Sequence, residues 1–210
     1  MVDTSYKTVL AQASDEFVEK RSRFIGYCKP VATEEDALAF INEIKTKHWD
    51  ARHNVYAYCL REGQIKRYSD DGEPQGTAGM PTLDVLLKNQ LTDVAVVVTR
   101  YFGGVLLGTG GLVRAYSHSA KLAVEAAGIV KMEECLVCTV KCDYNKYGKV
   151  SALIPQCGGV VDDSAFAADV EISFHINQQG FNSLSKQLAD ATCGDVMPVE
   201  EFKEYFAVTK

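Results

Sequence analysis

The chain has 210 residues, of which 47% are hydrophobic and 24% charged. This is an ordinary globular composition, and it excludes a disordered chain, a collagen and a simple coiled coil. The formal charge of −6 has the wrong sign for a protein whose whole surface wraps nucleic acid. The charge is unevenly divided, because residues 1–128 carry 15 basic and 16 acidic side chains and residues 129–210 carry 7 and 12. A polyanionic partner is therefore expected to bind the first part.

Targeting and cysteine patterns favour a cytosolic protein. The first ten residues lack the basic-then-apolar pattern of a secretory signal. The uncharged stretch 101–113 is too short and too rich in glycine to span a bilayer. The cysteine count of seven is odd, which argues against a disulfide framework. Cys135 and Cys138 lie in a predicted strand and point to opposite faces, so we interpret them as small core residues rather than zinc ligands.

Helix and strand patterns alternate along the first part. Thr33 and the acidic residues after it predict a helix start, followed by apolar residues at helical spacing. The run Val94–Val98 predicts a strand that is covered on both faces. The expected order is a strand at 23–31, a helix at 33–47, hairpin strands at 54–60 and 64–68, a Gly-rich loop at 70–79, a short helix from 80, a strand at 93–100, and a helix that begins after Gly111 and ends at Gly128.

The second part has a simpler pattern. Between 169 and 176, apolar and polar residues alternate, which predicts a half-buried strand. The expected elements are strand 130–142, helix 144–155, strand 159–166, strand 169–176, helix 179–192 and strand 196–206. This β-α-β-β-α-β order is the ferredoxin-like split unit. The sequence therefore predicts two α+β domains, 1–128 and 129–210.

An anion site is predicted where glycines precede the last helix of the first domain. A Gly-rich turn at a helix start offers free N–H groups and the positive end of the helix dipole, which suit a phosphate or carboxylate. The candidate residues are Arg23, Arg100, Gly103, Gly104, Thr109, Gly110, Gly111 and Arg114. The alternative is structural: the glycines make tight turns, and the arginines pair with nearby acids such as Asp71 or Glu73.

The loop 70–79 offers a possible metal or loop site. Its candidate residues are Asp71, Glu73 and Thr77, with His53 as the histidine that can reach the loop and act as an acid–base group. Carboxylates there could hold Mg²⁺ beside a phosphate. His48 is expected at the surface. No nucleophile elbow or zinc-protease motif is present, so we predict no catalytic residue and no required cofactor, and a non-enzymatic role is favoured.

Three motifs in order resemble the YigZ/IMPACT family. They are Arg23-Phe24-Ile25, then Asp70-Asp71-Gly72-Glu73-Pro74 with Gly76-Thr77-Ala78-Gly79, and then Val98-Thr99-Arg100-Tyr101-Phe102-Gly103-Gly104 with Leu107-Gly108. The match covers about residues 20–127, and the remainder resembles the small C-terminal domain of the bacterial YigZ branch. The resemblance implies a first domain with the fold shared by a small-subunit ribosomal protein, elongation factor G domain IV and the GHMP kinases. It implies a second domain similar to elongation factor G domain V.

Three functional hypotheses follow. The resemblance favours a cytosolic binding protein related to the regulation of translation, which would contact RNA, the ribosome or a translation-associated protein through the first domain. The second hypothesis is a Mg²⁺-dependent enzyme or sensor for a small phosphorylated metabolite or nucleotide at the Gly-rich loop. The third is a protein–protein module whose glycines are purely structural.

Overall fold

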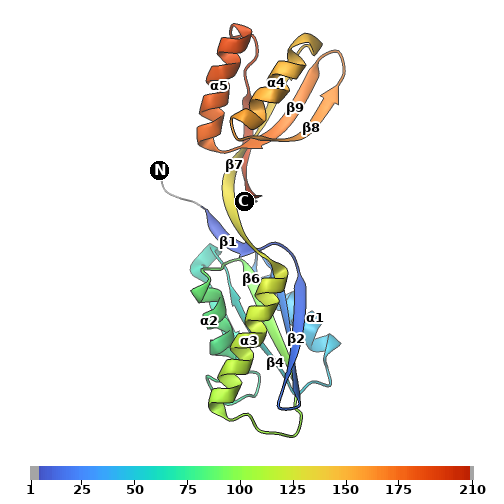
Figure 1. Ribbon diagram of the computed structural model, residues 1–210, viewed down its shortest axis with the longest axis vertical. Coiled ribbons are helices and arrows are strands. Elements are labelled where there is room, and N and C mark those ends of the chain that lie inside the picture. Colours follow the sequence, from blue (N-terminus) through green and yellow to red (C-terminus); the bar gives the residue numbers. More distant parts are fainter. Residues whose placement is uncertain (1–4, 209–210) are drawn as a thin grey trace. The chain divides into compact units, whose positions relative to one another are not determined.

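The computed structural model describes residues 5–208, which form a mixed α+β protein with five α-helices and two sheets. The predicted α+β class is confirmed. The chain divides into two compact units, Tyr6–Lys131 and Met132–Val208 (Figure 1). No helix within residues 5–208 is both long enough and apolar enough to cross a membrane.

The first unit is an antiparallel sheet with helices on both faces. Its elements are β1 (Tyr6–Val9), β2 (Ala13–Glu19), β3 (Ser22–Pro30), α1 (Glu34–Lys47), β4 (His53–Cys59), β5 (Lys66–Ser69), α2 (Gly79–Lys88), β6 (Val94–Tyr101) and α3 (Thr109–Ala127), with a 3-10 turn at Glu62–Gln64. The sheet order is β2-β3-β6-β4-β5. One face packs on α1 and the other on α2 and α3 (Figure 1). The central strand β6 is buried from Val94 to Arg100, as its apolar run predicts.

The strands β1 and β2 are absent from the sequence prediction. Strand β2 pairs with β3 along its whole length, from Ala13 opposite Cys28 to Glu19 opposite Ser22. It lies at the sheet edge, and none of its residues is fully buried. Its side chains therefore need not be apolar, and the alternation that marks a half-buried strand is missing.

The second unit has the predicted ferredoxin-like order. It contains β7 (Ile129–Cys142), α4 (Tyr144–Gln156), β8 (Val160–Phe166), β9 (Val170–Ile176), α5 (Gln178–Thr192) and β10 (Val199–Val208). Strand β7 pairs with β1, β9 and β10, and β8 lies beside β9, so this sheet has five strands. Val170, Ile172, Phe174 and Ile176 are all buried against the helices, as the alternation predicts.

The surface position predicted for His48 is wrong. Only 9% of His48 is exposed, and both ring nitrogens are hydrogen-bonded to tyrosines. Nε2 lies 2.7 Å from the hydroxyl of Tyr27, and Nδ1 lies 2.8 Å from that of Tyr101. The hydroxyl of Tyr101 donates to Asp50 at 3.0 Å, so it accepts its bond from the Nδ1–H of a neutral His48. Burial lowers the pKa of His48 below its ordinary value.

The first unit is expected to lose stability as the pH falls below about 6.5, the ordinary pKa of histidine. The folded state lowers the pKa of His48, so the unfolded chain binds this proton first, and acid shifts the equilibrium towards unfolding. The contribution is complete above the unfolded pKa and is lost as the pH falls towards the folded pKa. Urea unfolding at pH 7.5 and pH 5.5 measures the loss. It should be smaller in His48→Gln, and an equal loss in both proteins would contradict the assignment.

Candidate functional site

A cleft of about 470 Å³ opens at one end of the first unit's sheet. Antiparallel pairing places His53, at the start of β4, opposite Arg100, near the end of β6. The loop after β5 adds Glu73, and the start of α3 adds Thr109. Segments that are far apart in the sequence therefore meet in one cleft, because in an antiparallel sheet the start of one strand lies beside the end of its neighbour.

A buried ion pair lies at the base of the cleft. One oxygen of the Glu73 carboxylate, Oε1, accepts hydrogen bonds from Nη1 of Arg100 and from the hydroxyl of Tyr116. The side chains of Glu73 and Arg100 are only 4% and 6% exposed. Burial and the neighbouring carboxylate raise the pKa of Tyr116, so its hydroxyl stays protonated and donates. Nε2 of His53 lies 3.8 Å from the same oxygen.

The side chain of Arg100 has a hydrogen-bond donor that the described chain does not use. Its Nε is buried and has no hydrogen-bond partner in the described chain. The guanidinium carbon lies 5.4 Å from the ring centre of Phe24 and 5.5 Å from that of Phe102. Two aromatic faces therefore hold the cation, while Glu73 neutralises its charge from one side.

The acidic residues of loop 70–79 are engaged separately. The carboxylate of Asp70 accepts from the backbone N–H groups of Gly76, Ala78 and Gly79, at the start of α2. The hydroxyl of Thr77 donates within the loop, to the carbonyl of Pro74. These bonds fold the loop on itself.

Asp71 has its own partners and does not join Glu73 in a cation site. It accepts from Nζ of Lys45 at 2.8 Å and from the backbone N–H of Asn54 at 2.7 Å. Nδ1 of His53 donates to its carbonyl oxygen at 2.8 Å. Among residues 5–208, no group of three or more His, Cys, Asp or Glu side chains could hold a metal ion. Asp71 and Glu73, both candidates for a possible metal or loop site, therefore belong to two separate ion pairs, with Lys45 and with Arg100.

The start of α3 is open. Gly108 precedes the helix with a φ of 72°, and no side chain caps the first turn. At the starts of the other four α-helices of the described chain, a side-chain oxygen accepts a backbone N–H; the acceptors are Thr33, Asp70, Asp143 and Asn177. The N–H groups of Thr109, Gly110 and Gly111 precede the first possible intrahelical bond and are left for a ligand or solvent.

The predicted arginines do not gather at one point. Strand pairing sets Phe24 opposite Arg100, so Arg23, one residue earlier, points to the other face of the sheet. There Arg23 pairs with Glu16. Arg114 lines a second hollow, of about 260 Å³, together with Lys20 and Gly111.

The two loop glycines serve the fold. A Cβ on Gly103 would lie 2.1 Å from the backbone of Arg21, so this glycine permits a close approach between two loops rather than to a ligand. Gly104 has a φ of 83°, which a turn requires.

Two basic residues near these hollows, Lys20 and Arg52, are not among the candidate residues predicted from the sequence. Lys20 occupies the β2–β3 turn and lines the hollow of Arg114. Arg52 precedes β4 and lies over the ring of Phe102, with 5.9 Å between the guanidinium carbon and the ring centre. The signal for both is a basic residue next to a strand end. This signal can be recognised only when strand β2 and the order of the strands in the sheet are known.

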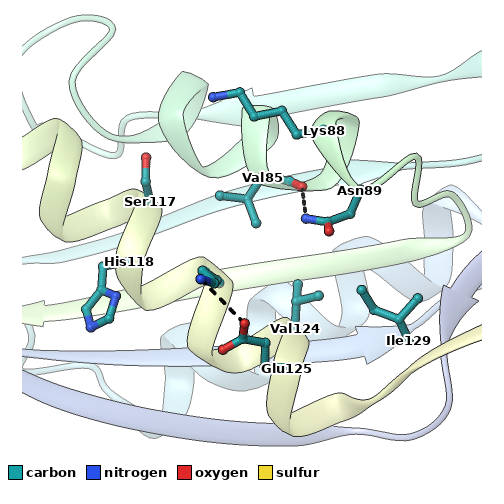
Figure 2. A pocket seen from close by; sticks show the side chains of 9 residues that line it. Val85, Lys88, Asn89, Ser117, His118, Val124, Glu125 and Ile129 are labelled. Atoms are coloured by element: carbon teal, nitrogen blue, oxygen red, sulfur yellow. Dashed lines mark hydrogen bonds and ion pairs between the residues drawn. The ribbon is translucent and has the colours of Figure 1, made fainter.

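A third hollow, of about 310 Å³, runs between α2 and α3 (Figure 2). Val85 and Val124 line it with apolar surface, and Lys121 faces Glu125 across one helical turn at 3.6 Å. None of the predicted site residues lines this groove. The open helix start and the buried arginine point instead to the cleft and to the neighbouring hollow of Arg114.

The geometry defines a two-domain α+β protein with a cleft at one end of the sheet of its first unit, and family models match both units. Residues 20–124 match the Impact N-terminal domain, and residues 140–194 match a domain of unknown function, DUF1949. The chain is 38% identical over 191 residues to the IMPACT family member YvyE of Bacillus subtilis, covering 90% of this chain and 88% of the relative. It is 34% identical over 187 residues to the IMPACT family member YigZ of Escherichia coli, covering 87% and 92%. The chain belongs to the IMPACT family, as its three motifs predict.

Two further matches extend the comparison. The Protein IMPACT homolog of Dictyostelium discoideum is 33% identical over 128 residues, which are 59% of this chain and 35% of that protein. A solved structure described as a crystal structure of a hypothetical protein superposes with a TM-score of 0.60 at 31% identity, over 97% of this chain and all of the other. Both units of the chain therefore have counterparts in a known structure.

Proposed function

We propose that the first unit binds RNA through its phosphate groups, in a role related to translation. The observation that carries the proposal is a set of uncommitted donors around the start of α3. Lys20 and Arg114 line one hollow with Gly111, and neither has an ion-pair partner in the described chain. Exposed cations and free helix N–H groups are the usual contacts to nucleic-acid phosphates.

The exposure of each basic residue determines whether it can contact an RNA chain. An RNA backbone reaches exposed side chains such as those of Lys20, Arg52 and Arg114. It does not reach the guanidinium of Arg100, which is buried beneath the surface. Arg23 is on the opposite face and is neutralised by Glu16. We therefore assign RNA contact to Lys20, Arg52 and Arg114 and withdraw Arg23 and Arg100 from it.

The second unit does not contribute to this surface in the proposal. Residues 129–210 carry 7 basic and 12 acidic side chains, which disfavours a polyanion. Phe102, by contrast, is 38% exposed beside Arg52, and an exposed aromatic ring next to cations suits an unpaired base. The proposal is accordingly for single-stranded RNA at the first unit.

The double variant Lys20→Ala/Arg114→Ala should weaken binding to a single-stranded RNA in a filter-binding assay. Loss of two phosphate contacts should also reduce the slope of log K against log salt by about 1.4. The matched control is Lys66→Ala/Arg67→Ala, which removes the same charge from the exposed strand β5 at the opposite edge of the sheet. Equal losses in both variants, or no binding by the wild type at low salt, would overturn the proposal.

A further inference from the structure

The cleft contains a cation whose hydrogen-bonding capacity is only partly used. Arg100 offers several N–H donors, yet within the described chain only Nη1 has a partner, Glu73. Its Nε is buried without any partner. Buried donors without partners are rare in folded proteins, and each is a reason to look for a ligand. Arg100 lines the cleft directly, so a ligand that enters the cleft meets this side chain.

The open start of α3 faces the same cleft. Gly108 and Thr109 line it, and no side chain caps the helix there. With 19 residues, α3 is long enough for its dipole to place partial positive charge at this end. The helix start and Arg100 come from different elements, and both favour an anion in the same space.

The remaining walls suit a flat or apolar group. Phe102, Leu106, Leu107 and Leu112 line the cleft. Arg52 lies over the ring of Phe102 at the rim. A volume of about 470 Å³ falls within the range of small-molecule sites. The cleft therefore combines one polar, cationic end with an apolar wall, an arrangement that orients a ligand with one charged end.

We propose that the cleft binds a small phosphate monoester with a planar apolar body. Its phosphate contacts the first N–H groups of α3 and Arg100, and its body lies against Phe102. A phosphate has three terminal oxygens and uses more of these donors than a carboxylate does. Glu73 and Tyr116 act as positioning residues that hold Arg100 in place. The site shares Arg52 and Phe102 with the proposed RNA surface, whereas Lys20 and Arg114 line the other hollow and not this cleft.

The first test is a thermal-shift titration of the whole chain at constant ionic strength. Phenyl phosphate should raise the Tm in a concentration-dependent manner, because a ligand that binds the folded state stabilises it. Inorganic phosphate, which lacks the ring, and benzoate, which lacks the phosphate, should give smaller shifts. No shift with phenyl phosphate would overturn the site. An equal shift with benzoate would overturn the choice of phosphate, and an equal shift with inorganic phosphate would overturn the planar body.

The second test uses a charge change at the mouth of the cleft. Thr109→Asp should abolish the phenyl phosphate shift, because a carboxylate at the helix start competes with the ligand for the same donors. The control Thr109→Asn has nearly the same shape without the charge and should keep the shift. An acidic residue in the first turn favours the helix, so the Asp variant should remain folded. Equal shifts in both variants would overturn the assignment.

The RNA proposal and the small-molecule proposal can be contradicted independently of each other. Lys20→Ala/Arg114→Ala removes two RNA contacts outside the cleft and should leave the phenyl phosphate shift unchanged, because neither residue lines this cleft. If that double variant loses phenyl phosphate binding while Thr109→Asp keeps it, the small-molecule site lies in the other hollow and the proposal made here is wrong.

Discussion

Replacing Glu73 by alanine is expected to lower the free energy of unfolding by about 3–5 kcal/mol, the usual cost of breaking a buried ion pair from one side. The variant leaves the guanidinium of Arg100 buried, with only 6% of its side chain exposed and its main partner gone. It also removes the acceptor of the Tyr116 hydroxyl. Urea unfolding followed by circular dichroism measures the loss.

A double-mutant cycle separates this cost from simple loss of packing. Glu73→Leu/Arg100→Met replaces both charges with apolar groups and should be more stable than Glu73→Leu alone, since no buried charge remains unpaired. Additive effects of the two substitutions would show that Glu73 and Arg100 are not energetically coupled, contrary to their hydrogen bond.

Replacing Gly103 by alanine should lower the free energy of unfolding by about 1–3 kcal/mol, the usual cost of forcing extra atoms into a packed position. The new Cβ would lie 2.1 Å from the backbone carbon and oxygen of Arg21. Neither group is the end of a flexible side chain, so the β2–β3 turn or the start of the β6–α3 loop must move. Because Lys20 lies in that turn, RNA affinity should fall with stability.

Gly110→Ala is the matched control. Gly110 lies in α3, and a Cβ there would meet no atom within 4 Å. The substitution should raise the free energy of unfolding by about 0.4–1 kcal/mol, because it restricts the unfolded chain without straining the fold. Equal stability of Gly103→Ala and wild type would show that the two loops approach less closely than the structure has them.

The elements that sequence reasoning predicted are those with one dominant local signal. The run Val94–Val98 marks a strand covered on both faces, and the alternation from Val170 to Ile176 marks one covered on a single face. Thr33 and the acidic residues after it mark the start of α1. Strand β2 has no such signal, since it is held by backbone pairing with β3 and not by burial.

The candidate site was predictable in composition but not in arrangement. Arg100 and Glu73 belong to motifs that the sequence singles out, and the pairing of an arginine with Glu73 is one of its alternatives. The separation of Arg23 from Arg100 depends on strand register, because shifting a strand by one residue changes the face of every side chain. Arg114, on α3, and Arg100, on β6, line different hollows, and their separation depends on how the helix packs on the sheet. Neither property can be read from local pattern.

The strand order of the first unit has a consequence for how this protein is made. In chain order β6 is the last strand of its sheet, yet in space it is the middle one, between β3 and β4. During synthesis, β2–β3 and β4–β5 can pair as neighbours, but each hairpin leaves an apolar edge unpaired until Tyr101 has emerged from the ribosome. Insertion of β6 joins the two hairpins through long-range contacts, the slow kind in folding. Because the same strand carries Arg100, the sheet closes and the base of the cleft is assembled in one event.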